Sequence, residues 1–452
     1  MTLFFQNAKL YIDPEQMAAD YLRVYYGNQK ITYPINPFQM LKDAGILFAL
    51  KSFNKLEGVY IPAETPDDIA TVGININRPI ARQRFTAAHE LCHHFRDSNR
   101  QIACPVGQKS ALEVFADKFA AAVLMPIDEL RKQVDQRKKR GYIDFDAVLD
   151  IANYFGVSFE SCLYRIAYLV HAIEGNTEVS ELRKRTRRYA PQSKRKEKGY
   201  TDLALYEGLI DAYADTLAFE PNEHARYVFQ NHYIYNDSRM EGVEVDIDAA
   251  AEIVTDLRLK KQNSVYCDEE NEAYLSIAGH YAMYQDILSL PVADSCSVFD
   301  SVGLNRKLFS CYPYPEFGGS FRQNDTLVLG AKFETVTHTQ IFSEMLHADE
   351  ELQELFANRN NITLSKYIEG VVQLHHRLTV IHPYADGNGR TLRALLNVML
   401  IRAGVLPIYI KVEEKDEYVQ ALECADLYGN YVPLYEFMFK IILQRSVELC
   451  AG

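Results

Sequence analysis

The sequence predicts a mainly α-helical protein of two domains, an N-terminal α+β domain followed by an all-α C-terminal domain. Its 452 residues exceed what one hydrophobic core normally organises. Apolar residues recur at helical spacing through most of the chain, whereas strand-like alternation is confined to the first third and to residues 316–330. We place the first domain at residues 1–180 and the second at 201–452, joined by residues 181–200.

The composition is typical of a globular protein and argues against membrane proteins and nucleic-acid-binding proteins. Hydrophobic residues make up 48% and charged residues 24% of the chain, as in ordinary globular proteins. No apolar run approaches the ~18 residues of a membrane span, and the N-terminus has no signal-peptide pattern. The eight cysteines form no CxxC pair, so we expect reduced thiols and a cytoplasmic location. The net charge of −13 argues against direct binding of nucleic acid.

The segment between the domains has an unusual charge. Residues 183–198 contain nine basic residues and one acid, Glu197, with Pro191 and Ser193 in the middle. Such a run is typical of a solvated linker. The alternative is a patch that binds nucleic acid or an acidic partner, but the near absence of interleaved aromatic residues favours the linker.

The first domain begins with two helices, predicted over residues 13–26 and 38–44 from the spacing of their apolar residues. Strand-like runs follow at 58–61 and 71–77, separated by a turn that contains Pro and Asp. The next helix contains the sequence HELCH, which leads to the first candidate site.

HELCH places two histidines one helical turn apart. His89 and His93 therefore lie on one helix face and can bind one Zn²⁺, while Glu90 can take a proton from metal-bound water. We interpret Cys92 as a packing residue, with a redox-sensitive position near the metal as the alternative. His94 is one position off the ligand face and is expected to be structural.

A third ligand is expected from the helix predicted over residues 111–124. Glu113 and Asp117 lie one turn apart on it, so one carboxylate can bind the metal while the other orients a ligating histidine. The alternative is that both are solvated surface acids. Their position shortly after the HELCH sequence favours ligand and orienter.

HELCHHF, EVFADKFAAAVLMP and residues 151–167 resemble the ImmA/IrrE metallopeptidases, and the resemblance spans roughly residues 10–175. It implies a zincin-like Zn²⁺ endopeptidase in which His89, His93 and Glu113 bind the metal and Glu90 is the general base. In known systems the substrate is often a DNA-binding repressor, so a repressor or other regulator is the expected target. Cys92 stands where a small residue, commonly Gly, is usual.

The second domain is predicted to be helical over residues 206–217, 224–233, 249–257, 272–288, 340–356 and 364–380. Residues 316–330 differ, because turn residues separate short alternating runs in the pattern typical of a β-hairpin.

Residues 382–393, HPYADGNGRTLR, lead directly into an apolar helical run. Gly387 and Gly389 let backbone N–H groups approach a phosphate at this helix N-terminus, and Asn388 can add a side-chain N–H. Asp386 is a hard oxygen ligand that suits Mg²⁺.

The same stretch contains a possible base and two cations. His382 can deprotonate an incoming hydroxyl, and Arg390 and Arg393 can neutralise phosphate charge. Tyr384 is expected to anchor the loop in the core. Each residue has an alternative as a turn former, a solvated helix residue or a core histidine, but their joint occurrence favours a nucleotide site.

This stretch closely matches the HPFxDGNGRxxR motif of the Fic family, with Tyr384 for the usual Phe, and the resemblance covers roughly residues 201–452. It implies transfer of AMP from ATP to a Ser, Thr or Tyr hydroxyl of a protein. His382 would be the base, Asp386 the Mg²⁺ ligand and Arg393 the γ-phosphate contact. The implied phosphate cradle is Gly387, Asn388, Gly389 and Arg390.

Three other segments agree with this resemblance. Residues 316–330 are similar to the family's flap, which would hold the protein substrate by strand addition. Tyr418 and Asp426 fall where the family contacts adenine, although Asp426 replaces a common Asn. Residues 236–245 resemble the inhibitory helix, so Glu241 is expected to pair with Arg393 in place of the γ-phosphate. Asp237 stands where that pattern has Ser or Thr, and the alternative is a helix turn with no regulatory role.

The leading prediction is autoinhibited protein AMPylation with a zinc peptidase fused in cis, by analogy a toxin, stress-response or phage-defence module. In one alternative the peptidase is the physiological activity and the Fic-like domain senses nucleotide. In another the peptidase domain only docks targets. UMP transfer and AMP removal are further possibilities. The target protein and the oligomeric state are not predicted.

Overall fold

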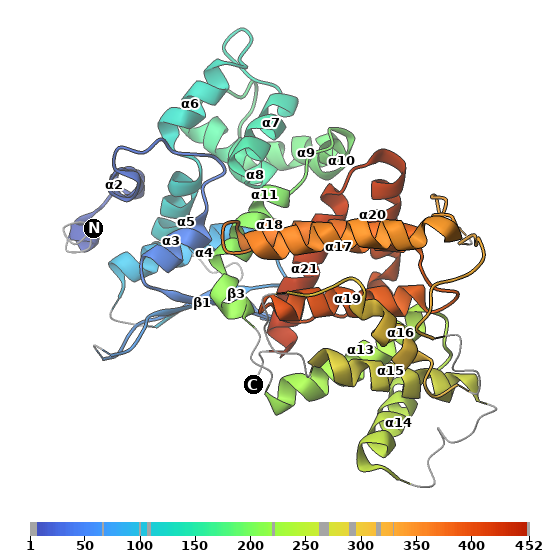
Figure 1. Ribbon diagram of the computed structural model, residues 1–452. Coiled ribbons are helices and arrows are strands. Elements are labelled where there is room, and N and C mark those ends of the chain that lie inside the picture. The colour runs from blue at the N-terminus through green and yellow to red at the C-terminus, as the bar shows by residue number, and fades with distance from the viewer. Residues whose placement is uncertain are drawn as a thin grey trace. The chain divides into compact units, whose positions relative to one another are not determined.

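The computed structural model describes residues 7–65, 67–98, 101–105, 110–218, 222–261, 271–288, 295–312, 318–328 and 330–449. The chain divides into two compact units, Met1–Ala212 and Tyr213–Gly452. The first unit contains helices and one sheet, and the second is helical, which confirms the predicted fold class (Figure 1). Within the described ranges, no helix combines the length and hydropathy that crossing a bilayer requires.

A four-stranded mixed sheet with the order β1-β3-β2-β4 is the frame of the first unit. β1 (Leu47–Lys51) runs parallel to β3 (Thr71–Asn75), whereas β2 (Leu56–Ile61) is antiparallel to both β3 and β4 (Ile102–Pro105). The strand predictions for β2 and β3 are confirmed, and β1 and β4 were not predicted. Gly58 of β2 pairs with Cys104 of β4, and this places β4 beside the HELCH helix.

Helices cover this sheet and position the HELCH sequence. α4 (Ile80–Arg96) carries that sequence and packs on β2 and β3, and α5 (Ala111–Leu124) packs on α4. The Ser110 hydroxyl accepts a hydrogen bond from the Glu113 N–H and so fixes the start of α5. The other helices of this unit are η1 (Ala8–Leu10), α2 (Pro14–Tyr26), α3 (Pro37–Asp43), α6 (Ile127–Asp135), α7 (Phe145–Phe155), α8 (Phe159–Arg165), η2 (Ile166–Val170), α9 (Val179–Tyr189), α10 (Pro191–Glu197) and α11 (Leu203–Ala212).

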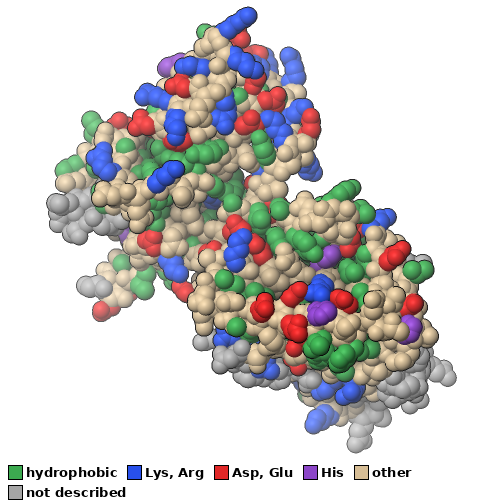
Figure 2. Space-filling model, turned by 45° about the horizontal axis from the view of Figure 1, so that its top comes forward, with side chains coloured by type: hydrophobic (Ala, Val, Ile, Leu, Met, Phe, Trp, Pro, Cys, Tyr) green, Lys and Arg blue, Asp and Glu red, His purple; other side chains and the backbone are tan. Residues whose placement is uncertain are grey.

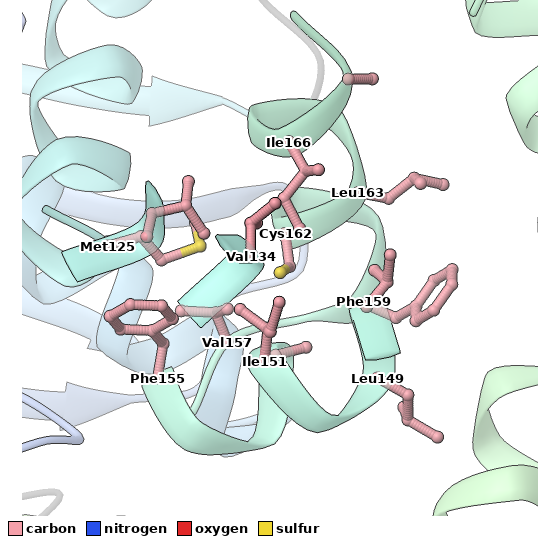
Figure 3. Close-up of a cluster of buried hydrophobic side chains, with 14 of the residues drawn as sticks. Met125, Val134, Leu149, Ile151, Phe155, Val157, Phe159, Cys162, Leu163 and Ile166 are labelled. Carbon is pink, nitrogen blue, oxygen red and sulfur yellow. The ribbon is translucent and has the colours of Figure 1, made fainter. Parts of the chain in front are cut away.

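The helices after α5 enclose a hydrophobic core that also includes Ala88 of α4 and Ala120 and Leu124 of α5. Cys162 of α8 is fully buried in this core, where its apolar neighbours account for its burial (Figure 3). The side chains that surround it in the close-up are Met125, Val134, Ile151, Phe155, Val157 and Ile166. The core continues to Leu182 of α9, which has no exposed surface.

Residues 181–200, the predicted linker, are largely helical. They lie in α9 and α10, and acids on α7 bind their polar groups. The Tyr189 hydroxyl donates to Asp146 at 2.6 Å, and Lys198 pairs with Asp150 at 2.5 Å. On the face drawn in Figure 2, Lys and Arg side chains are interspersed with Asp and Glu. Most of the basic side chains between residues 183 and 198 are nevertheless exposed, as expected of a solvated segment, and its role as a linker stays a prediction.

The boundary of the first unit lies after α11 rather than at residue 180. The Asn36 side-chain N–H₂, at the start of α3, donates to the carbonyl of Gly208 at 2.8 Å. Leu205 packs so closely on Gly156 that a Cβ on this glycine would lie 2.6 Å from the Leu205 Cδ2. α11 is thus part of the first unit.

The second unit is organised around α19 (Asn388–Arg402), which is buried on all sides over most of its length. α18 (Leu364–Ile381) packs on α19 and ends at the His382 loop, so helix packing sets both sides of that loop. The remaining helices are α12 (Ala214–Leu217), α13 (Glu223–Met240), α14 (Ile247–Leu259), α15 (Glu272–Leu288), α16 (Asp300–Leu308), η5 (His338–Gln340), α17 (Ile341–Asn358), η6 (Val412–Glu414), α20 (Lys415–Tyr428) and α21 (Val432–Leu449).

The hairpin predicted over residues 316–330 differs in the structure. Among its described residues, 318–328 and 330, none belongs to a regular strand. Instead Phe321 forms an isolated bridge with Tyr384, and the Arg322 N–H donates to the Pro383 carbonyl at 2.9 Å. This segment therefore pairs with the loop after α18 rather than with itself. Residues 316, 317 and 329 lie outside the described ranges.

Candidate active sites

The two histidines of HELCH meet on one face of α4, as their spacing predicts. The Nε2 atoms of His89 and His93 are 3.1 Å apart, and both rings are buried. Glu113 of α5 faces them, with Oε2 3.1 Å from the His89 Nε2 and Oε1 3.5 Å from the His93 Nε2. Although burial lowers the pKa of His89, Asp117 and Glu113 raise it to about 9, so the group favours a cation.

Carboxylates also hold the far nitrogen of each ring. Asp117 Oδ1 lies 3.0 Å from the His89 Nδ1, the position that its spacing from Glu113 predicted. Asp97 Oδ2 lies 3.0 Å from the His93 Nδ1, and sequence reasoning missed it. Its position four residues after His93, just past the end of α4, was the available signal. Two such carboxylates leave both Nε2 atoms free to accept a metal, and the donor set fits Zn²⁺.

Glu90 points into the protein beside these histidines. Its side chain has no exposed surface, and neither carboxylate oxygen has a hydrogen-bond partner among the described residues. Burial raises the pKa of Glu90, as suits a group that exchanges a proton. Gly58 of β2 makes room for it, because a Cβ there would collide with Oε1 of Glu90. Gly58 is a second residue that the sequence did not single out.

Cys104 of β4 is a third missed residue. Its sulfur lies 3.5 Å from the His89 Nε2 and 3.9 Å from Oε1 of Glu113. No motif spacing could find it, because β4 was not predicted. The cleft that opens onto the group has a volume of about 200 Å³. It is lined by Glu57, Arg82, Phe85, Thr86, His89, Glu90, Cys104, Pro105, Glu113 and Asp117.

Two other residues of this helix that the sequence analysis singled out, Cys92 and His94, have structural environments. Cys92 is buried with 1% of its surface exposed and is not among the residues that could hold a metal. His94 turns to Tyr60, whose hydroxyl lies 3.2 Å from its Nδ1. Burial lowers the pKa of His94 to about 4, so this ring is neutral and fits the predicted structural role.

In the second unit, the loop after α18 is held by its own side chains. His382 is the C-cap of α18 in the left-handed conformation, with φ +50°. The Asn388 side chain accepts from the Tyr384 N–H at 2.9 Å and donates to the Tyr384 carbonyl at 2.8 Å. Its amide thus closes the loop instead of facing a ligand. Tyr384 is fully buried, with its hydroxyl 2.6 Å from Ser301 Oγ, which confirms it as the core anchor.

Two further side chains that the sequence did not reveal fix this loop. Arg322 donates from Nε to the His382 carbonyl at 2.8 Å, and it is 5% exposed. Asn305 of α16 donates to the Asp386 carbonyl at 3.2 Å and to Thr391 Oγ1 at 3.1 Å. Burial lowers the pKa of His382, so the imidazole is neutral near pH 7 and can accept a proton.

The start of α19 has the shape of an anion cradle. Gly387 has φ +72° and is the N-cap of the helix. A Cβ on Gly389 would collide with Oε1 of Glu241 and come within 2.9 Å of Arg393 Nη1. A carboxylate therefore lies where the helix N-terminus would attract a phosphate. Asp386 is largely exposed at the mouth of the loop, and Arg390 Nη1 donates to Ser276 Oγ at 2.8 Å.

Arg393 is bound by two acids. Its Nη2 donates to Oε1 of Glu241 at 2.5 Å, as the inhibitory-helix resemblance implied. Its Nε donates to Oδ1 of Asp237, and Oδ2 of Asp237 lies 2.9 Å from the His280 Nε2. Although burial raises it, Arg393 and His280 together lower the pKa of Asp237, so this carboxylate is charged. Sequence reasoning noted Asp237 only as a departure from the pattern.

Tyr418 and Asp426, predicted near adenine, have partners on α18. The Tyr418 hydroxyl lies 2.7 Å from the His375 Nε2, and burial lowers the pKa of His375 to about 3. Asp426 Oδ1 lies 2.7 Å from the His376 Nε2. Both contacts tie α20 to α18, and a contact with adenine stays a prediction.

Two protein families match separate parts of the chain. Residues 41–167 match the IrrE N-terminal-like domain, and residues 300–400 match the Fic/DOC family. The first range includes the whole histidine–glutamate group. The second includes the His382 loop and most of α19.

Named relatives match the C-terminal site. The protein adenylyltransferase Fic of Nematostella vectensis is 26% identical over 224 residues, covering 48% of this chain and 47% of the relative. The protein adenylyltransferase fic-1 of Caenorhabditis elegans is 28% identical over 147 residues, covering 32% of this chain and 27% of the relative. The chain thus matches less than half the length of these relatives.

Solved structures give weaker likenesses. A Fic domain-containing signalling protein from Bacteroides thetaiotaomicron has a TM-score of 0.43 and 18% identity, covering 56% of this chain and 98% of that one. Fic-1 of C. elegans (residues 134–508) has a TM-score of 0.44 and 17% identity, covering 73% of this chain and 98% of that one.

Proposed function

The chain combines an IrrE N-terminal-like domain with a Fic/DOC family domain, and we propose that it is a protein adenylyltransferase restrained by its own Glu241. The reaction transfers AMP from ATP to a Ser, Thr or Tyr hydroxyl of a protein. One observation carries the proposal: Glu241 binds Arg393 and lies against Gly389, at the helix N-terminus where phosphate would bind.

The residues divide the chemistry between them. His382 accepts the proton of the target hydroxyl while its oxygen bonds to the α-phosphorus and pyrophosphate leaves. Gly387, Gly389 and Arg390 hold the phosphates, and the Asn388 side chain keeps the loop in shape for them. Asp386 would hold a Mg²⁺ ion, which neutralises phosphate charge when bound. The Asp386 side chain is largely exposed at the mouth of the loop, so its carboxylate is accessible to an ion that arrives with ATP.

Restraint follows from geometry and charge. With Glu241 on Arg393, a γ-phosphate meets a carboxylate instead of a free guanidinium, so ATP is held unproductively. The protein substrate is expected beside residues 318–328, which already pair with the His382 loop through Phe321. AMP removal is the alternative, because a carboxylate in this place can also orient a water.

Intact mass after incubation with ATP and Mg²⁺ tests this function. The Glu241→Gly variant should gain AMP at least about tenfold faster than wild type, a change of ~1.4 kcal/mol in activation free energy. Glu244→Gly, an exposed acid three residues on, is the control and should behave as wild type. Equal labelling of all three proteins contradicts restraint by Glu241, and no labelling of any contradicts AMP transfer.

We also propose that the first domain is a zinc endopeptidase acting in the cytoplasm on a repressor or another regulator. His89, His93 and Glu113 would hold the metal, which supplies an activated water when bound, and Glu90 would move its proton. The buried, unpartnered Glu90 oxygens beside the two histidines favour this over a docking role. A stoichiometry near one Zn²⁺ per chain after gentle purification supports it, and a clear deficit contradicts it.

A further inference from the structure

Cys104 lies inside the group of side chains assigned to the zinc site, and we propose that its thiolate is a fourth metal ligand that closes the site. The proposal rests on the zinc site of the first domain. His89, His93, Cys104 and Glu113 each offer one donor atom, and these atoms all lie within 4.8 Å of one another. Among the described cysteines, Cys104 alone belongs to such a group.

The spacing of these atoms fits one tetrahedral ion. With Zn–N near 2.1 Å and Zn–S near 2.3 Å, tetrahedral angles put N···N at about 3.4 Å and N···S at about 3.6 Å. The Nε2 atoms of His89 and His93 are 3.1 Å apart, and the Cys104 sulfur is 3.5 Å from the His89 Nε2. The sulfur is 3.9 Å from Oε1 of Glu113, and no two of the four donor atoms are more than 4.8 Å apart, so small side-chain shifts would bring all four onto one ion.

The sheet brings Cys104 to this place independently of the helices. Cys104 pairs with Gly58 across β2 and β4, and Gly58 itself lies against Glu90. Cys104 is 5% exposed, so its sulfur faces the group rather than solvent. Cys92, on α4 with the histidines, is equally buried but outside the group, which shows that burial alone does not bring a thiol there.

A fourth protein ligand changes what the site can do. Structural zinc sites have four protein ligands, whereas catalytic sites keep one position for water. With Cys104 bound, that position is filled and Glu90 has no metal-bound water to deprotonate. The peptidase is then latent, and cleavage requires Cys104 to leave the metal so that water can take its place.

Cobalt substitution in the full-length chain tests the proposal, because a thiolate on Co²⁺ gives a charge-transfer band in the near ultraviolet that histidine and carboxylate ligands do not give. The wild type and Cys162→Ala should show this band at one Co²⁺ per chain. Cys104→Ala should bind Co²⁺ without it. Cys162 is the matched control, since it is fully buried in the same unit but away from the group. X-ray absorption of the zinc protein should likewise show a Zn–S distance near 2.3 Å only where Cys104 is present.

The outcomes separate failure of this proposal from failure of the zinc site. Stoichiometric Co²⁺ without the band in wild type overturns Cys104 as a ligand and keeps the site. No Co²⁺ in wild type, equal to a His89→Ala control, overturns both. Added azide gives a further check: it should change the visible spectrum of the Co²⁺-loaded Cys104→Ala protein and leave that of wild type unchanged. An equal azide response in both proteins overturns closure by Cys104.

Discussion

Asp237 and Arg393 form a buried ion pair, in which the side chains are 5% and 10% exposed and the Arg393 Nε donates to Oδ1 of Asp237. Glu241 binds the other end of the same guanidinium and is more exposed. The two acids therefore have different consequences. Loss of Glu241 frees Nη2 for phosphate, while Asp237 keeps Arg393 aimed at the start of α19.

Asp237→Asn should destabilise the second unit, because it leaves a buried guanidinium with a weaker partner. Removing one member of a buried ion pair lowers the free energy of unfolding by about 3–5 kcal/mol. Because Arg393 keeps its contact with Glu241, we expect a decrease of about 3 kcal/mol. Calorimetry of the full chain should show a lower Tm for one transition. Asp248→Asn, at an exposed position of α14, is the control. Equal melting of both variants would contradict a stabilising pair.

The same pair predicts an acid-dependent stability. The pKa of Asp237 is lowered in the folded protein, so its contribution is complete above the unfolded value of about 3.9 and is lost as pH falls through the folded value. The Tm difference between wild type and Asp237→Asn should thus be constant from pH 7 to about 5 and shrink below about 4. A difference that persists undiminished at pH 2 would contradict this assignment of charge.

His382→Ala should abolish AMP transfer, because no other base is predicted in the loop. Loss of general-base catalysis costs about 10²–10⁴-fold. The comparison is made in the Glu241→Gly background with labelled ATP, and zinc content should stay unchanged. His347→Ala, an exposed histidine of α17, should keep full transfer. Transfer that persists in His382→Ala would remove His382 from the reaction.

Arg322→Ala should slow AMP transfer without weakening nucleotide binding. Arg322 donates a hydrogen bond to the His382 carbonyl and is not one of the residues predicted to bind phosphate. A misplaced base can cost up to about 10²-fold. We expect a lower kcat with a nearly constant KM for ATP, again in the Glu241→Gly background. Arg258→Ala, exposed on α14, controls for loss of charge. A change in KM alone would contradict a positioning role.

Gly58→Ala should disable the peptidase site without removing its metal. The added methyl group collides with Glu90 and Thr86 but with none of the predicted ligands, so bound Zn²⁺ should match that of wild type. Cleavage of an unfolded protein such as casein should fall to the level of Glu90→Gln, both in the Cys104→Ala background. Gly303→Ala, whose Cβ meets no atom within 4 Å, is the control. Full cleavage by Gly58→Ala would contradict this packing constraint on Glu90, and full cleavage by Glu90→Gln would exclude Glu90 as the base.

Periodicity and motif spacing predicted the helices well and the long-range partners poorly. The helix over 111–124 and its pair Glu113 and Asp117 lie where the sequence placed them. His89 and His93 depend only on helix geometry, so i,i+4 spacing was sufficient. Cys104 and Gly58 depend on strand register, and a four-residue strand such as β4 carries too little pattern to reveal it.

Other departures from the sequence-based expectations have the same origin. The residues after 316 alternate as a hairpin would, but Phe321 and Arg322 find their partners in the loop after α18. The basic run near residue 190 was interpreted from its own charge, whereas Tyr189 and Lys198 also contact Asp146 and Asp150 of α7. Asp237 stands where the inhibitory-helix pattern has Ser or Thr. Its role as an ion-pair partner depends on Arg393, more than 150 residues later in the chain.

The hydrogen bond from Asn36 to Gly208 has a practical consequence for separating the two domains experimentally. A fragment cut at residue 180 or 200, where the charge pattern suggests a boundary, would lose α11 and expose the apolar surface around Gly156 that Leu205 covers. An independently folding peptidase fragment should therefore extend to Ala212, and a separate transferase fragment should begin at Tyr213.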